Sequence, residues 1–187
     1  VKPDARETVA RLREMGLGII VVTNQSAIGQ GMFDERRLEA IHHRLAELLD
    51  SEGIQLDGIY YCPHTPEDGC CCRKPRAGLL ERAATELGFV PSRGFVIGDK
   101  PCDLELGRAV GATTLLVRTG YGQDVASTCG SLADWVVDDL IQAAEVIQGL
   151  VQNPAPFSPE TADVVVLCGG RGSRLGSLTA STPKPLL

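Results

Sequence analysis

The chain lacks the long apolar run and the excess of basic residues that would indicate a membrane or nucleic-acid partner. No segment approaches the roughly 18 consecutive apolar residues of a membrane span. Its 24 acidic residues outnumber its 18 basic residues, and the net charge of -6 argues against binding to nucleic acid or to an anionic membrane. The first residues, VKPDARE, also lack the apolar segment of a secretory signal. We therefore expect a globular protein in the cytoplasm.

The cysteines also indicate a reducing compartment, because seven of them occur without a signal sequence. Four of them lie with one histidine in CPHTPEDGCCC, at residues 62–72. A structural zinc site takes four tetrahedral Cys or His ligands. We therefore predict that zinc is held by Cys62, His64, Cys70 and Cys72. The alternative is a chance cluster of buried or oxidised thiols, and the other four cysteines are expected to be packing residues.

Helix-like and strand-like segments alternate along residues 1–150. Apolar spacing and capping residues predict helices at 4–15, 34–52, 77–87, 103–110 and 138–150. Short apolar or β-branched runs predict strands at 18–22, 59–61, 94–97, 113–117 and 135–137. Such alternation is typical of an α/β domain with a mostly parallel sheet. Ligands of such sheets bind at the carboxyl ends of the strands.

The first predicted strand opens into a row of polar residues. Thr23, Asn24, Gln25 and Ser26 offer hydroxyl, amide and backbone N–H groups that can hold phosphate oxygens. The alternative is ordinary turn chemistry, because these residue types are common after strands.

Two charged groups follow other predicted strands. Arg73 and Lys74 come directly after the cysteine segment, where a fixed Arg could bind a phosphate with two hydrogen bonds and a Lys could act as a point charge. The alternative is a solvated surface pair. Asp99 follows a predicted buried strand, and Asp103 lies four residues further on. The two carboxylates could hold Mg²⁺, which takes one or two carboxylates together with waters and phosphate oxygens. The alternative is that Asp99 or Asp103 caps the helix that follows.

The strings VVTNQS, CPH followed by CCCRKP, and GDKPCD occur in an order that resembles the haloacid dehalogenase-like phosphatases. They most resemble the branch of D-glycero-D-manno-heptose 1,7-bisphosphate phosphatases and histidinol phosphatases. The resemblance implies a Rossmann-like three-layer sandwich with a zinc-stapled loop. It also implies that Thr23 and Lys74 stabilise the transferring phosphoryl group and that Asp99 binds Mg²⁺. The residues it places against a phosphorylated sugar are Thr23, Asn24, Gln25, Ser26, Arg73, Lys74 and Lys100.

One motif of that family does not occur in the chain. The family's Asp-x-Asp motif supplies the nucleophile and the general acid, and no such pair exists in the 187 residues. We therefore expect residues 1–150 to be a phosphatase domain truncated before its first strand, and inactive as it stands. The alternatives are a catalytically dead sugar-phosphate-binding module and a small zinc-stabilised interaction module.

The C-terminal segment has a different character. Residues 151–161 are rich in proline and predict a linker. Residues 162–187 resemble the start of a sugar-1-phosphate nucleotidyltransferase, and so predict an incomplete second α/β domain. The resemblance implies that a nucleoside triphosphate contacts Gly169, Gly170, Gly172, Arg174 and Lys184. Such an enzyme consumes the sugar 1-phosphate that a heptose bisphosphatase leaves, which favours heptose over histidinol phosphate. The alternative is a flexible Gly-rich tail.

Overall fold

The structure is a computed structural model that describes residues 3–51, 53–152 and 162–169. Its α-helices are α1 (Pro3–Glu14), α2 (Ser26–Gly29), α3 (Glu35–Asp50), α4 (Gly78–Leu87), α5 (Pro101–Ala109), α6 (Gly122–Cys129) and α7 (Leu140–Gln152). Its strands are β1 (Gly18–Asn24), β2 (Gly58–Cys62), β3 (Phe95–Gly98), β4 (Thr113–Val117), β5 (Trp135–Val137) and β6 (Val164–Cys168). The predicted elements are confirmed to within a few residues, whereas the short helices α2 and α6 were not predicted.

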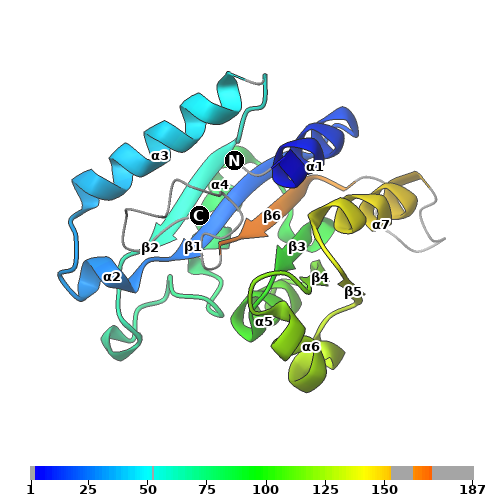
Figure 1. The fold of residues 1–187 in the computed structure, drawn as a ribbon. Helices are drawn as coiled ribbons and strands as arrows, with labels where there is room; N and C mark the ends of the chain where they lie inside the picture. Colours follow the sequence, from blue (N-terminus) through cyan, green and yellow to red (C-terminus); the bar gives the residue numbers. More distant parts are fainter. Residues whose placement is uncertain (1–2, 52, 153–161, 170–187) are drawn as a thin grey trace.

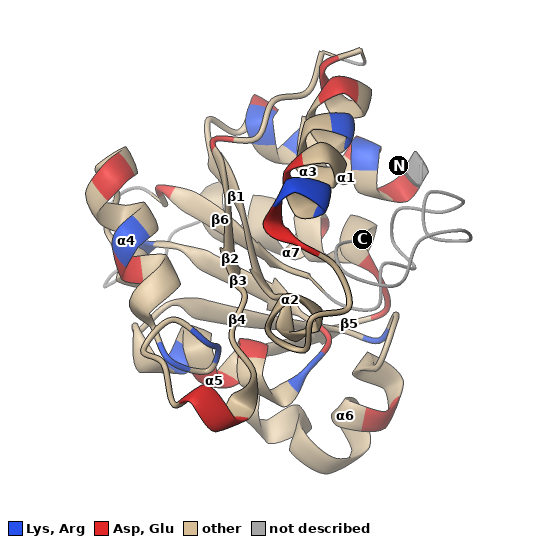
Figure 2. Ribbon diagram, turned by 90° about the vertical axis from the view of Figure 1, so that its left-hand side faces the viewer, with Lys and Arg blue, Asp and Glu red and all other residues tan. Residues whose placement is uncertain are grey.

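All six strands are parallel and follow the order β2-β1-β6-β3-β4-β5 (Figure 1). Helices α1, α3 and α7 pack on one face of the sheet, and α4 and α5 pack on the other. The predicted three-layer α/β sandwich with a parallel sheet is therefore confirmed. Figure 2 shows Lys, Arg, Asp and Glu mainly on the helices and loops, while the strands carry none of them.

The core forms because each helix places apolar residues three or four positions apart on its inner face. In α3 these are Leu38, Leu45 and Leu49, which are buried against the same face of the sheet as Leu12 of α1 and Ile147 of α7. Each such side chain contributes roughly 1.5–3 kcal/mol by leaving water. The central strands β1, β6, β3 and β4 are mostly buried on both faces and accordingly read as largely apolar runs, whereas Trp135 and Val136 of the edge strand β5 are exposed.

Strand β6 belongs to the segment 162–187 that was predicted to begin a second domain. In the structure β6 lies at the centre of the sheet, between β1 and β3 (Figure 1). Gly18 of β1 pairs with Val164, and Phe95 of β3 pairs with Val165. The physical reason is that β1 and β3 each need a partner for their backbone groups, and an apolar parallel strand can be buried between them.

Most of the predicted linker and the rest of the predicted second domain, residues 153–161 and 170–187, lie outside the described residues. The candidate nucleotide ligands in that region are Gly170, Gly172, Arg174 and Lys184. Among the helices of the described part, none has the length and apolar character needed to cross a bilayer.

The imidazole of His42 on α3 makes stability depend on pH. Its ring lies 5.6 Å from that of Tyr61, and burial lowers the pKa of His42 from 6.5 to about 4. The unfolded chain therefore binds a proton at a higher pH than the folded chain, so protonation favours unfolding as the pH falls through this window. As the pH falls from 6.5 to about 4, we expect the free energy of unfolding to decline less for His42→Gln than for the wild type. Urea unfolding at several pH values measures this difference. His43→Gln on the exposed side of α3 is the control, and parallel declines for wild type and His42→Gln would contradict the prediction.

Candidate functional site

The loop after β2 brings the four predicted zinc ligands together. The Sγ atoms of Cys62, Cys70 and Cys72 and a ring nitrogen of His64 all lie within 4.8 Å of one another. Sulfur–sulfur distances are 3.3 Å from Cys72 to Cys62 and 3.6 Å from Cys62 to Cys70. Zinc–sulfur bonds of about 2.3 Å in a tetrahedron put ligand atoms about 3.8 Å apart, so the donor set and its spacing fit zinc. Four protein ligands leave no open position, so such a site would be structural.

The predicted zinc loop also holds Arg73. The guanidinium Nη1 of Arg73 donates to the carbonyl oxygen of His64 at 3.1 Å and to Ser26 Oγ at 2.8 Å. The same group is thereby tied to the metal loop and to the loop that follows β1. Of the predicted substrate contacts, Ser26 has its hydroxyl directed at Arg73.

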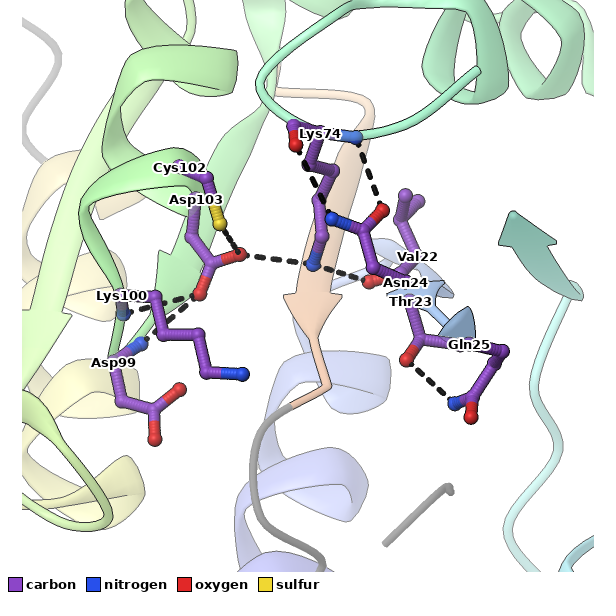
Figure 3. Close-up of polar contacts among 9 residues, drawn as sticks. All are labelled: Val22, Thr23, Asn24, Gln25, Lys74, Asp99, Lys100, Cys102 and Asp103. Atoms are coloured by element: carbon purple, nitrogen blue, oxygen red, sulfur yellow. Dashed lines mark hydrogen bonds and ion pairs between the residues drawn. The ribbon is translucent and has the colours of Figure 1, made fainter. Parts of the chain in front are cut away.

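The ammonium group of Lys74 is the buried centre of the site. Lys74 is only 4% exposed, and its Nζ donates to Val22 O at 2.7 Å and lies 2.8 Å from Asp103 Oδ1 (Figure 3). Burial alone would lower the pKa of Lys74, but the Asp103 carboxylate raises it above its ordinary value. Lys74 is therefore charged at neutral pH.

The backbone of Lys74 is fixed by a second residue of the β1 loop. Asn24 Nδ2 donates to Lys74 O at 3.2 Å, and Lys74 N donates to Asn24 Oδ1 at 3.0 Å. Asn24 was predicted to contact the substrate, but both ends of its amide bind the Lys74 backbone. These two hydrogen bonds align the Lys74 backbone with the end of β1.

Asp99 lies fully buried at the end of β3. Its Oδ2 accepts a hydrogen bond from the Tyr121 backbone N–H at 3.1 Å. Gly120, the residue before Tyr121, has φ +68°, and a Cβ built there would lie 2.1 Å from Asp99 Oδ2. Glycine is therefore needed for the loop to approach the carboxylate. Lys100 lies with its Nζ 5.1 Å from the centre of the Tyr121 ring. A buried carboxylate at this edge is a hard oxygen donor of the kind that Mg²⁺ prefers.

Asp103, which the sequence offered as a second carboxylate for Mg²⁺ or as a helix cap, binds protein groups through both oxygens. Its Oδ2 accepts from the N–H groups of Asp99 at 3.3 Å and Lys100 at 3.2 Å, while Oδ1 pairs with Lys74. It therefore caps α5, as the alternative interpretation held, and neutralises the buried ammonium as well. Asp103 is the second Asp of the string GDKPCD. Its position in that string is compatible with a helix cap and with an ion pair, and spacing alone does not distinguish the two roles.

Thr23 completes the edge on the other side of β6. Its side chain is buried, and Oγ1 accepts from Gln25 Nε2 at 2.9 Å. Gly169, which follows β6, lies beside Thr23. A Cβ built at Gly169 would be 2.8 Å from Thr23 Oγ1. Gly169 was predicted to contact a nucleotide, and in the structure it lies at this edge of the sheet.

The three strand ends that the sequence singled out therefore meet at one edge of the sheet. Figure 3 shows Thr23 and Gln25 on one side of β6, Asp99 and Lys100 on the other, and the Lys74 ammonium between them. The arrangement combines two ammonium groups, a hydroxyl and a carboxylate. Such a set can bind a phosphoryl group together with a divalent cation.

Comparison with known proteins agrees with this geometry. A family model described as HAD-hydrolase-like matches residues 71–143. The D-glycero-beta-D-manno-heptose-1,7-bisphosphate 7-phosphatase of Pseudomonas aeruginosa is 39% identical over 145 residues, which cover 78% of this chain and 82% of that protein. The histidine biosynthesis bifunctional protein HisB of Legionella pneumophila is 32% identical over 176 residues, covering 88% of this chain and 50% of that protein.

A solved structure is also similar. The D,D-heptose 1,7-bisphosphate phosphatase from B. bronchiseptica, complexed with magnesium and phosphate, matches with a TM-score of 0.73 at 32% identity, covering 80% of this chain and 84% of that one. Fold and sequence similarity thus agree. The chain belongs to the haloacid dehalogenase-like phosphatases, in the branch of the D-glycero-beta-D-manno-heptose-1,7-bisphosphate 7-phosphatases.

Proposed function

We propose that this protein removes the 7-phosphate of D-glycero-D-manno-heptose 1,7-bisphosphate. The observation that carries the proposal is the buried Lys74 ammonium, which lies between Thr23 and Asp99 at the carboxyl edge of the sheet. Such groups neutralise the charge of a transferring phosphoryl group. The 39% identity to a heptose bisphosphatase supports the choice of sugar. The alternatives are histidinol phosphate as substrate, and a sugar-phosphate-binding module without catalysis.

In this proposal each polar group has its own task. Lys74 and Thr23 stabilise the phosphoryl oxygens in a loose transition state, where positioning and charge neutralisation do most of the work. Arg73, held by the predicted zinc loop, and Lys100 bind the rest of the substrate. Magnesium, held by Asp99, would supply further positive charge at the phosphoryl oxygens when bound.

The proposed nucleophile is an aspartate of an Asp-x-Asp motif, which the 187 residues do not contain. Its carboxylate would attack phosphorus and displace the sugar oxygen, which would take a proton from the second aspartate. Water would then cleave the aspartyl-phosphate and restore the carboxylate. We propose that a segment outside these residues supplies the motif, and we expect the 187 residues alone to release no phosphate.

A protein that includes the Asp-x-Asp segment is the material for the test. Its kcat/KM is expected to be at least about tenfold higher for heptose 1,7-bisphosphate than for histidinol phosphate, a difference of about 1.4 kcal/mol in transition-state stabilisation. Phosphate release measures both rates, and Asp99→Asn should abolish both. A higher kcat/KM for histidinol phosphate would overturn the choice of sugar. Saturable binding of the sugar phosphate without turnover would instead favour the non-catalytic module.

We also infer, from sequence resemblance alone, that the parent protein uses a nucleoside triphosphate in a nucleotidyltransferase domain. The Gly-rich segment and Pro183-Lys184-Pro185 carry this inference. The domain would consume the sugar 1-phosphate left by the phosphatase, so the two reactions would be consecutive. Because β6 belongs to the phosphatase sheet here, the inference concerns residues 170–187.

A further inference from the structure

Gln25 has a more specific place in the site than a contact with substrate. Its side chain is 2% exposed, and its Nε2 donates to Thr23 Oγ1 at 2.9 Å. Its backbone N–H donates to Cys62 O at 2.7 Å, which ties this residue to the first predicted zinc ligand. Figure 3 shows the Gln25 side chain reaching Thr23 from the side away from Asp99 and Lys74. Gln25 therefore supports Thr23 from behind.

The direction of this hydrogen bond determines what the Thr23 hydroxyl can do. A hydroxyl has one proton to donate and two lone pairs that accept. The Gln25 amide nitrogen can only donate, so it occupies a lone pair of Thr23 Oγ1 and leaves the proton free to point elsewhere. A phosphoryl oxygen is only an acceptor, so a threonine that binds it must donate that proton.

We propose that Gln25 is a positioning residue that makes Thr23 a hydrogen-bond donor to a phosphoryl oxygen. The inference rests on the proposed function, because it requires a phosphoryl group at this edge of the sheet. It changes the role expected from the sequence, in which Gln25 itself contacted the substrate. A carboxamide suits the task because its nitrogen fixes the polarity of the bond, whereas a carboxylate at the same position would accept the Thr23 proton.

A double-mutant cycle on the 187-residue chain tests the proposal. The dissociation constant of inorganic phosphate is measured by calorimetry with Mg²⁺ and Zn²⁺ present, for wild type, Gln25→Met, Thr23→Val and the double variant. Gln25→Met is expected to weaken binding about tenfold, which is the worth of one hydrogen bond. In the Thr23→Val background the same change should have no effect, because Gln25 acts only through the hydroxyl. In the Thr23→Ser background the tenfold loss should return, because serine restores the hydroxyl.

Three results would overturn the proposal. A loss from Gln25→Met that persists in Thr23→Val would show that Gln25 acts by direct contact or by packing, while the phosphate site itself stands. Unchanged binding in Gln25→Met would show that the hydrogen bond has no role. Absence of phosphate binding in the wild type would count against the proposed function, and the role of Gln25 would fall with it. If Gln25→Met fails to unfold cooperatively, Gln25→Asn replaces it, because its shorter amide cannot reach Thr23.

Discussion

Lys74→Met is expected to lower the free energy of unfolding by about 3–5 kcal/mol, because it leaves the buried Asp103 carboxylate without its ammonium partner. Both side chains are almost inaccessible to water, at 2% for Lys74 and 0% for Asp103, and their charged atoms lie 2.8 Å apart. The lost hydrogen bond to Val22 O adds to the effect. Urea unfolding at neutral pH measures the change.

Two further variants separate charge from packing in this prediction. Asp103→Asn keeps an oxygen that can accept from the backbone N–H groups of Asp99 and Lys100 but removes the charge. The double variant Lys74→Met with Asp103→Asn should therefore recover much of the lost stability. Arg44→Met breaks an exposed ion pair with Glu47 and should have little effect. A Lys74→Met protein as stable as the wild type would contradict the buried ion pair.

About one zinc ion per chain is the second expected result. Cys62→Ser or Cys72→Ser should reduce bound zinc to well below one per chain, because a hydroxyl is a poor substitute for a thiolate ligand of this metal. Since metal-binding energy is also folding energy, both variants should unfold at a lower temperature than the wild type. Elemental analysis after dialysis, together with thermal unfolding, measures the two effects.

Cys71 provides a matched control for the zinc prediction. It lies in the same loop, between two predicted ligands, but its side chain is exposed and outside the cluster. Cys71→Ser should therefore keep the zinc and the unfolding temperature of the wild type. Stoichiometric zinc in both Cys62→Ser and Cys72→Ser would rule out the proposed ligand set.

Local patterns were sufficient to predict most of the fold and the main groups of the site. Helices and strands are recognisable because their apolar spacing is a property of neighbouring residues. Thr23 and Asp99 follow apolar strands, and the carboxyl ends of parallel strands meet at one edge. The four predicted zinc ligands lie within one short segment, so their spacing alone indicated the cluster that the structure shows.

The sequence could not indicate which strand pairs with which, or which groups the polar site residues contact. The apolar run at residues 163–167 predicts a strand, which the structure shows as β6, but nothing in the run specifies the sheet that the strand joins. Asn24 and Gln25 have the same polar character whether they face a ligand or the protein, and the structure turns both toward protein groups. Asp103 is likewise compatible with a helix cap alone, and its pairing with Lys74 depends on contacts distant in sequence.

The central place of β6 determines the order in which the sheet can be completed. In the part of the chain that the structure describes, β2 and β1 form one half of the sheet, β3, β4 and β5 form the other, and β6 joins them. During synthesis from the N-terminus both halves exist before the strand that connects them. Pairing Gly18 with Val164 closes a loop of nearly the whole described chain, and such high contact order slows folding. Within the described residues β6 is the strand that supplies partners for the facing edges of β1 and β3, so the pairing of those two edges depends on a strand distant in sequence.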